Sequence, residues 1–370
     1  EKEEGPMGIE ILGLPLYYYI AMVAKVLIAF VFVLLTVAYA TYAERKIIGF
    51  MQVRIGPNRT GPMGLLQPIA DGLKLFFKEE IVPAESNKFA FLIAPLIALV
   101  PAFITFAVIP FGDTIKVFGY DVPLQIVGYY DAGVGKVVDI NVGMLYVLAM
   151  TSLGVYGIVL AGWASNSKYS LLGGLRASAQ MISYELAAGL AIIPVFMLVE
   201  SLSLQEIIKA QTGFRWFIWN SPMTFVAGMI FYVATLAETN RVPFDLPEAE
   251  TELVSGFCTE YSSMKYAMFF MAEYANMVTA SALMVTLFLG GWDGPFASTF
   301  PLLSPIYFVA KIYFLMFMAM WIRATLPRYR YDQLMNLGWK VMLPASLCII
   351  AITAVAGYFG FHTFSGLFGN

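Results

Sequence analysis

Residues that hold redox centres are scarce in this sequence. It has two cysteines, Cys258 and Cys348, and a single histidine, His362. These are too few for an iron–sulfur cluster, and they cannot give a haem its usual pair of axial ligands within one chain. Any electrons that this protein uses must therefore come through partner chains.

Charge is scarce as well. Only 13% of the 370 residues are charged and 59% are hydrophobic, with a formal net charge of −3. A soluble globular protein has about 25% charged residues, so this composition excludes a soluble enzyme. The small net charge leaves no basic surface that would bind nucleic acid.

Long apolar runs dominate the sequence instead. A transmembrane helix needs about 20 apolar residues, and eight runs qualify: 17–43, 89–110, 143–163, 182–199, 222–240, 264–290, 302–324 and 340–360. We therefore predict an all-α integral membrane protein with about eight transmembrane helices in a single membrane domain, 1–370. Residues 1–16 read as a short external tail without the features of a secretory signal.

The basic residues predict the orientation of these spans. One set of loops carries 15 lysine and arginine residues, whereas the other set, together with the two ends of the chain, carries five. Because basic residues near spans resist translocation, we expect the first set on the cytoplasmic side and both termini outside. The outer loop 111–141 alternates apolar and polar residues, which predicts a short hairpin at the membrane surface.

Residues 64–78 predict an amphipathic helix that is too short to span the membrane. Its apolar stripe is Leu65, Leu66, Ile69, Leu73, Phe76 and Phe77, and its polar stripe is Gln67, Asp71, Lys74 and Lys78. We expect this helix along the cytoplasmic interface. It either returns the chain to the next span or binds lipid headgroups, for which it offers only two lysines.

Several ionisable residues stand inside or at the ends of the apolar runs, where a charge costs roughly 2.5 to 3.5 kcal/mol or more. They are Lys25, Glu44, Glu185, Glu238, Glu273, Lys311 and Arg323. We expect Glu185 at the start of the fourth span, Glu238 at the end of the fifth and Glu273 well inside the sixth. Carboxylates on successive helices can face one another, and a buried carboxyl group can exchange a proton near neutral pH.

A simpler interpretation is that a basic neighbour neutralises each acid or that the acid reaches the nearest interface. Glu44 is followed directly by Arg45 and Lys46. Lys25 and Lys311 are further candidate counter-charges, although the sequence does not say for which acid.

The loop between the fifth and sixth spans, 241–263, is the most acidic part of the chain. Its carboxylates are Asp245, Glu248, Glu250, Glu252 and Glu260. Glu248 and Glu252 would share one face of a short helix that begins near Pro247. A solvated loop is one interpretation, but interleaved apolar residues predict that it packs onto the protein: Pro243, Phe244, Leu246, Leu253, Val254 and Phe257. The acids lack the spacing of a calcium loop.

Six segments resemble one protein family. GLLQPIADGLKLFFKE (64–79) and PFDLPEAETELVSG (243–256) are similar to the two signature segments of the H subunit of respiratory complex I, the proton-pumping NADH:quinone oxidoreductase. AERK (43–46), QVRIGPNRTGP (52–62), NSKYSLLGGLRASAQMISYE (166–185) and WIRATLPRYRYDQLM (321–335) also resemble this family, in the same order along the chain.

The resemblance implies a place in a larger enzyme. In that family, the membrane chain and two peripheral-arm subunits enclose the chamber where quinone approaches the terminal iron–sulfur cluster, and antiporter-like subunits complete the membrane arm. Quinone would be a substrate shared with partner subunits, and this chain would hold no metal or flavin. The expected location is a bacterial inner (plasma) membrane with both termini on the periplasmic side, rather than an organelle membrane.

Matching positions imply roles for individual residues. The quinone-chamber residues at the membrane entrance would be Glu44, Arg45, Arg54, Asp71 and Lys74, together with Asp245 of the loop. The acidic link from chamber to membrane would be Asp245, Glu248, Glu250, Glu252 and Glu260. The buried acids that pass protons onward would be Glu185, Glu238 and Glu273. Arg241, Arg323, Arg328 and Arg330 would steady the cytoplasmic loops and the docked arm.

Three other functions stay open on the sequence. Buried acids on adjacent helices also suit a stand-alone cation/proton transporter, although the large loops punctuated by proline and glycine indicate docking surface. The anchor subunit of a membrane-bound hydrogenase-type complex would have the same fold with a different electron donor. A structural anchor would have no part in coupling quinone reduction to proton pumping.

Overall fold

A computed structural model of the chain describes residues 10–11, 14–112, 114–117, 120–126, 129–131, 136–138, 141–213, 215–246, 254–295, 297, 300 and 302–359. Its α-helices are α1 (Leu16–Met51), α2 (Gln67–Phe77), α3 (Lys88–Ile104), α4 (Gly143–Ala164), α5 (Lys168–Val199), α6 (Leu204–Ala210), α7 (Phe217–Asn220), α8 (Pro222–Glu238), α10 (Ser263–Phe288), α11 (Leu303–Thr325), α12 (Tyr331–Asn336) and α13 (Leu343–Tyr358). Short 3₁₀ turns are η1 (Pro62–Gly64), η2 (Thr105–Ala107) and η3 (Gly256–Cys258), and the π-helical segment η4 (Leu337–Met342) joins α12 to α13.

The described strands form three antiparallel pairs. They are β1 (Glu10–Ile11) with β2 (Leu14–Pro15), β3 (Thr114–Val117) with β4 (Tyr120–Pro123), and β5 (Tyr129–Asp131) with β6 (Lys136–Val138). Strands β3 and β4 are antiparallel, with Val117 paired to Tyr120 and Thr114 paired to Pro123. The hairpin expected within 111–141 is therefore confirmed.

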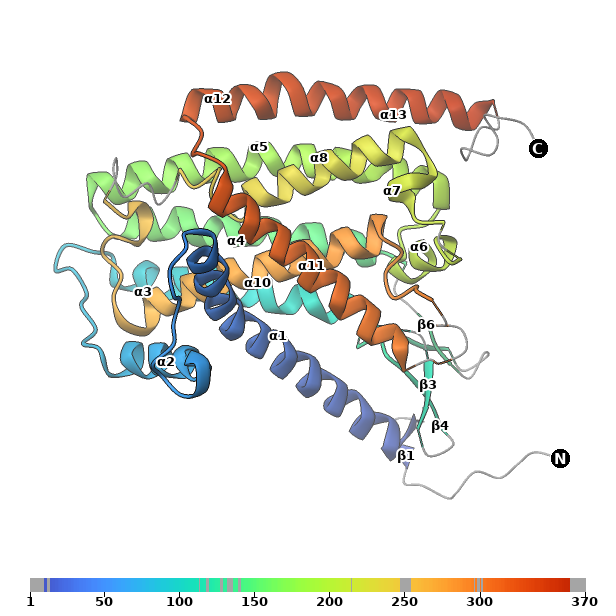
Figure 1. Ribbon diagram of the computed structural model, residues 1–370, viewed down its shortest axis with the longest axis horizontal. Coiled ribbons are helices and arrows are strands. Elements are labelled where there is room, and N and C mark those ends of the chain that lie inside the picture. Colours follow the sequence, from blue (N-terminus) through green and yellow to red (C-terminus); the bar gives the residue numbers. More distant parts are fainter. Residues whose placement is uncertain are drawn as a thin grey trace.

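The helices form a bundle of membrane-spanning length. Within the described residues, seven helices are long and apolar enough to cross a membrane, and α8 is apolar but shorter at 17 residues. The prediction of an all-α membrane protein with about eight transmembrane helices is thus confirmed. In Figure 1, α1 begins and α13 ends at the same end of the bundle, and the start of α1 lies near β4, whereas α2 lies near the opposite end.

Helix α5 corrects one predicted boundary. It begins at Lys168 rather than at 182, so Glu185 lies in the middle of the helix and not at its start. Buried polar residues of its first half pack against other parts of the protein and not against lipid. Gln180, which is fully buried, donates hydrogen bonds to the carbonyl oxygens of Ala237 and Phe244, both at 2.8 Å. Hydropathy alone places such residues outside a span, because it assumes contact with lipid.

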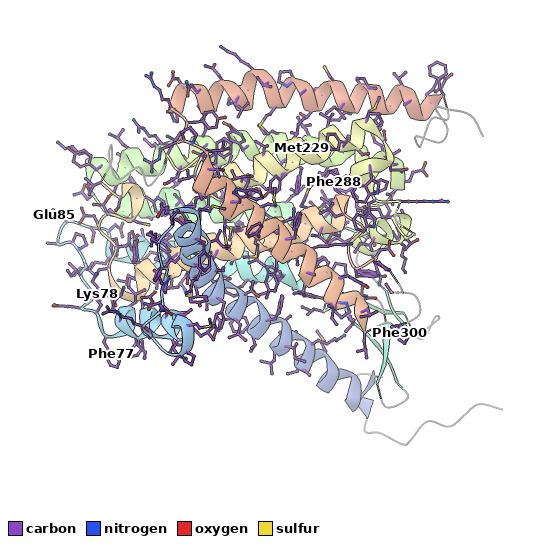
Figure 2. All side chains as sticks on the ribbon, in the orientation of Figure 1. Phe77, Lys78, Glu85, Met229, Phe288 and Phe300 are labelled. Atoms are coloured by element: carbon purple, nitrogen blue, oxygen red, sulfur yellow. The ribbon has the colours of Figure 1, made fainter. Side chains whose placement is uncertain are left out.

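Helix α2 confirms the predicted amphipathic helix. None of its residues is buried, and its apolar stripe has no cover within the described chain; Phe76 and Phe77 are 66% and 80% exposed. Figure 2 shows Phe77 and Lys78 at the periphery, away from the bundle that contains Phe288. An exposed apolar stripe of this kind fits the surface of a bilayer.

Close backbone contact joins α3 to α4. A Cβ atom built on Gly157 would lie 2.6 Å from the backbone nitrogen of Ala98 and 2.9 Å from the carbonyl oxygen of Ala94. Small residues permit such approach in membranes, where packing replaces the hydrophobic effect as the force between helices. Gly154, one turn earlier on α4, has no atom within 4 Å of the same built position.

We therefore expect Gly157→Ala to destabilise the protein by about 1–3 kcal/mol, because the backbones must separate to admit the methyl group. Gly154→Ala is the matched control, and its gain in helix propensity should leave stability unchanged or raised by up to about 1 kcal/mol. Thermal unfolding of the two variants in mild detergent compares them. Equal unfolding midpoints would contradict the close packing of α3 on α4.

Candidate functional site

A buried ionic cluster lies where α1, α10, α11 and the segment after α8 meet. Glu44 of α1 is its centre, and its Oε2 accepts a hydrogen bond from the Tyr274 hydroxyl at 2.7 Å. The same oxygen lies 3.4 Å from Nη1 of Arg241, and Oε1 accepts a hydrogen bond from Arg323. The Glu44 side chain is only 7% exposed. Two arginines and a hydroxyl therefore contact this carboxylate inside the bundle.

Arg241 is shared between two carboxylates. Its Nη1 faces Glu44, and its Nη2 lies 3.2 Å from Oε2 of Glu273 on α10. Its guanidinium carbon lies 4.1 Å from the centre of the Tyr274 ring, a cation–π contact. Since an uncompensated buried charge costs several kcal/mol, the position of this arginine matters to both carboxylates.

The interpretation in which Arg45 and Lys46 neutralise Glu44 is wrong. Nη1 of Arg45 reaches α2 and lies 2.7 Å from Oδ2 of Asp71. The ammonium of Lys46 lies over the Tyr42 ring, 5.9 Å from its centre. Adjacent residues on a helix point in different directions, so sequence neighbours of an inward-facing residue face elsewhere.

The residues expected at the chamber entrance divide into separate groups. Asp71 on α2 binds Arg45, accepts a hydrogen bond from Gln67 at 3.2 Å, and lies 3.8 Å from the Lys74 ammonium. Arg54 instead donates to the side chain of Gln52 at 2.7 Å. The ion pair between Arg45 and Asp71 fixes α2 against the end of α1, next to the residue that carries the buried cluster.

Three acids from three helices are brought together inside the bundle, with Glu238 in the middle. One small cavity of about 30 Å³ is lined by both Glu185 and Glu238. A second cavity of about 20 Å³ is lined by both Glu238 and Glu273. Thr239 and Asn276 line both cavities. A volume of roughly 10–15 Å³ accommodates one water molecule, so each gap between successive acids has room for a water that could relay a proton.

Glu185 has one further partner at the far end of this series. The Ser152 hydroxyl of α4 donates a hydrogen bond to its Oε1. The buried sequence of ionisable groups therefore runs from Arg323 and Glu44 through Arg241 to Glu273, then to Glu238 and Glu185. Its members come from five spanning helices and the segment after α8.

The lysines considered as counter-charges bind elsewhere. Lys311 donates to the carbonyl oxygens of Leu289 and Asp293, both at 2.7 Å, and lies 4.0 Å from the centre of the Trp216 ring. Lys25 donates to the carbonyl oxygen of Gln125 at 3.1 Å. Within the described residues, the counter-charge of Glu273 is Arg241.

The start of the acidic loop is bound to the segment after α11. Nη2 of Arg328 lies 3.0 Å from Oδ2 of Asp245. The Phe244 ring stacks on Tyr329 with centroids 5.6 Å apart, and the Tyr329 backbone N–H donates to the carbonyl oxygen of Pro243 at 3.0 Å. The predicted packing of this loop is confirmed for Phe244, Leu246 and Phe257, which are buried, whereas Val254 is exposed and that part of the prediction is wrong.

Of the other loop acids, Glu260 lies within the described residues. Glu248, Glu250 and Glu252, with Pro247 and Leu253, lie outside the described residues. Glu260 is half-buried next to Tyr261, whose ring stacks on Phe91 with centroids 4.1 Å apart. Burial raises the pKa of the Tyr261 hydroxyl above its usual range, with a further contribution from nearby Cys258. The stacking of Tyr261 on Phe91 connects the end of the loop to α3.

A groove of about 490 Å³ lies between α1 and α11 and leads toward the ionic cluster. It is lined by Phe32, Leu35, Thr36, Tyr39, Ala40, Ala43, Ile47, Tyr313, Met316, Phe317 and Met320. Ala43 directly precedes Glu44, and Met320 lies one turn before Arg323. A polar pair interrupts the apolar lining, because the Thr36 and Tyr313 hydroxyls are 3.1 Å apart.

Sequence reasoning missed several polar residues of the site. On α10, Tyr274 is the next residue after Glu273 and Asn276 lies one turn after it; a polar side chain one turn from an intramembrane acid is a signal that could have found Asn276. No comparable sequence feature pointed to Gln180, Thr239 or Ser152. Their roles depend on which helices touch, which hydropathy does not specify.

The fold and the site together define a membrane protein of many spans with a buried line of ionisable groups between its helices. Residues 24–354 match the sequence model of the NADH dehydrogenase family. The chain is 72% identical over 349 residues to an H subunit of NADH-quinone oxidoreductase from Geobacter sulfurreducens, covering 94% of this chain and 98% of that protein. It is 52% identical over 328 residues to the H subunit from Rickettsia prowazekii, covering 88% and 90%. The chain belongs to the family of NADH-quinone oxidoreductase H subunits.

Replacement of Arg241, which is shared by Glu44 and Glu273, should destabilise the protein. Arg241→Gln would leave Glu44 and Glu273 without a common counter-charge, so we expect a loss of about 3–5 kcal/mol or failure to assemble. Arg330→Gln is the matched control, because its ion pair with Asp332 is 3.6 Å long with side chains 80% and 67% exposed, and such pairs contribute about 0–1 kcal/mol. Thermal unfolding in detergent measures both, and similar midpoints would argue against a buried ionic hub.

Proposed function

We propose that this chain is the membrane subunit of a NADH:quinone oxidoreductase, complex I, that forms the membrane side of the quinone chamber. In this proposal it couples quinone reduction to proton translocation through its buried carboxylates. The family membership supports the first part. The buried line of groups from Arg323 and Glu44 to Glu185 is the single observation that supports the second.

The chemistry of a quinone agrees with these features. Its reduction consumes electrons and protons at a polar head, while its tail is apolar, so its site needs ionisable groups beside a path open to lipid. The groove between α1 and α11 ends next to Glu44 and Arg323 and has apolar walls. The electrons reach the head through partner chains, because this chain has too few ligands for a redox centre.

We expect Arg241 to couple a change of charge near Glu44 to the protonation of Glu273. A new charge near Glu44 changes how strongly that carboxylate attracts Arg241. If the arginine moves toward Glu44, Glu273 loses its counter-charge and takes up a proton; if it moves back, Glu273 releases one. Glu238 and then Glu185 would receive that proton across the two small cavities.

The proposed partners follow from the same assignment. They are peripheral-arm subunits that complete the quinone chamber and carry iron–sulfur clusters, antiporter-like subunits of the membrane arm, and membrane lipid. The bacterial relatives support a bacterial inner membrane location, and the excess of basic residues in one set of loops supports an orientation with both termini on the periplasmic side. The relatives from Geobacter sulfurreducens and Rickettsia prowazekii do not favour the hydrogenase-type anchor or the stand-alone transporter.

Removing the proton-exchanging group from single acids tests the proposal. We expect Glu238→Gln and Glu273→Gln each to lower quinone-driven proton pumping or quinone reductase activity, because an amide fills the same space but cannot exchange a carboxyl proton at pH 7. The assembled complex in sealed vesicles, with NADH as donor, gives both readouts.

Glu206→Gln is the matched control, because Glu206 lies exposed on α6 and lines neither of the two small cavities. It should pump like wild type. Wild-type pumping and activity in assembled Glu238→Gln and Glu273→Gln complexes would favour a structural anchor and reject the coupling role.

A further inference from the structure

Three residues line both of the small cavities between the buried acids. They are Glu238, Thr239 and Asn276. Glu238 is itself one of the acids, so Thr239 and Asn276 are the neutral residues that lie beside both gaps. Asn276 follows Glu273 by three positions on α10, and this spacing puts the two side chains on the same face of the helix.

The threonine hydroxyls around these cavities donate to their own helices. Thr239 donates to the carbonyl oxygen of Leu236 at 3.0 Å. Thr151, Thr235 and Thr279 each donate in the same way to a carbonyl oxygen three or four residues earlier. Because a hydroxyl has a single hydrogen, these side chains are left with lone pairs alone for a molecule in the cavity.

Asn276 differs from these threonines. Within the described residues, its amide has no hydrogen-bond partner, and neither has the carboxyl group of Glu238. Asn240, which lines the second cavity, instead binds Gln180 at 3.3 Å and the sulfur of Met181 at 3.7 Å. Polar groups inside a protein are nearly always hydrogen-bonded, either to the protein or to ordered water. The Asn276 amide, with two donor hydrogens and an acceptor oxygen, is therefore suited to bind water in both cavities.

We propose that Asn276 is a positioning residue for proton transfer between the buried acids. Its amide holds one water between Glu273 and Glu238 and a second water between Glu238 and Glu185. This inference rests on the proposed coupling function. Each water accepts a proton from the protonated acid on one side and gives another of its hydrogens to the carboxylate on the other side. The water is regenerated, and the amide neither gains nor loses a proton.

The size and lining of the cavities agree with one ordered water in each. Their volumes are about 30 Å³ and about 20 Å³, and one water needs roughly 10–15 Å³ and about three hydrogen bonds. Two acids and the Asn276 amide supply three partners in each cavity. Ionised acids only accept hydrogen bonds, so a donor to the water oxygen has to come from a neutral side chain. Asn276 offers one amide hydrogen to each water.

Electron cryo-microscopy of the assembled complex, at a resolution that shows ordered waters, tests the water positions. We expect one water in each cavity, with its oxygen about 2.7–3.2 Å from the Asn276 amide. Asn276→Leu, which keeps nearly the same size without a donor or acceptor, should remove both waters. Ser281→Ala is the matched control and should retain them. Ser281 is a buried polar residue of the same helix that donates to the carbonyl oxygen of Met277 at 2.8 Å and lines neither cavity.

Proton pumping in sealed vesicles, with NADH as donor, tests the role of these waters. We expect Asn276→Leu to lower the pumping rate several-fold and Asn276→Ser to restore most of it, because a serine hydroxyl both donates and accepts. Serine fills the space less well than leucine does. Loss with leucine and recovery with serine therefore separate hydrogen bonding from packing. Ser281→Ala should pump like wild type.

Any of three results would reject the role of Asn276: an amide bound directly to an acid with no water between them, both waters retained in Asn276→Leu, or wild-type pumping in Asn276→Leu. The wild-type map decides the first even where the leucine variant does not assemble. Glu238→Gln, measured alongside, separates this failure from that of the proposed function. Wild-type pumping in Asn276→Leu alone rejects the role of Asn276, whereas wild-type pumping in both variants rejects the coupling role as well.

Discussion

The sharing of Arg241 between Glu44 and Glu273 is the interaction on which the rest of this structure depends. One guanidinium satisfies two buried carboxylates from two helices, and Tyr274 contacts both Glu44 and Arg241. A buried ion pair contributes little net stability compared with apolar packing, but removal of one member is costly. Such a cluster therefore fixes the positions of α1 and α10 and responds strongly to any change in nearby charge.

The surrounding fold holds the residues of this cluster in place. Gln180 on α5 binds the backbone of α8 and of the following segment through Ala237 and Phe244. Asp245 and Phe244 then bind the segment after α11, and α11 itself supplies Arg323. The start of the loop that joins α8 to α10 is thus connected to α5 and to the segment after α11. A shift at any of these contacts would change the environment of Arg241.

The spans could be predicted from the sequence because the length of an apolar run is a local property. The amphipathic helix 64–78 and the hairpin in 111–141 could also be predicted, because the spacing of apolar and polar residues within one segment is a local property as well. The boundary of α5 was missed, since its first half buries polar residues such as Gln180 against other helices. The partners of the acids were also missed: Glu44 and Arg241 are separated by 197 positions, and the tertiary fold brings the segment after α8 to α1. The residue types indicated which acids were candidates. Which basic residue each acid contacts depends on the tertiary structure.

The most direct measurement of the central claim is the infrared difference spectrum of the assembled complex between its quinone-oxidised and quinone-reduced states. The account predicts a band of a protonated carboxyl group that changes on quinone reduction, that is lost in Glu273→Gln, and that is altered in Arg241→Lys, because lysine cannot contact both carboxylates as a planar guanidinium does. A wild-type spectrum without a carboxyl change, or the same band in Glu273→Gln, would contradict transmission of charge from Glu44 through Arg241 to Glu273.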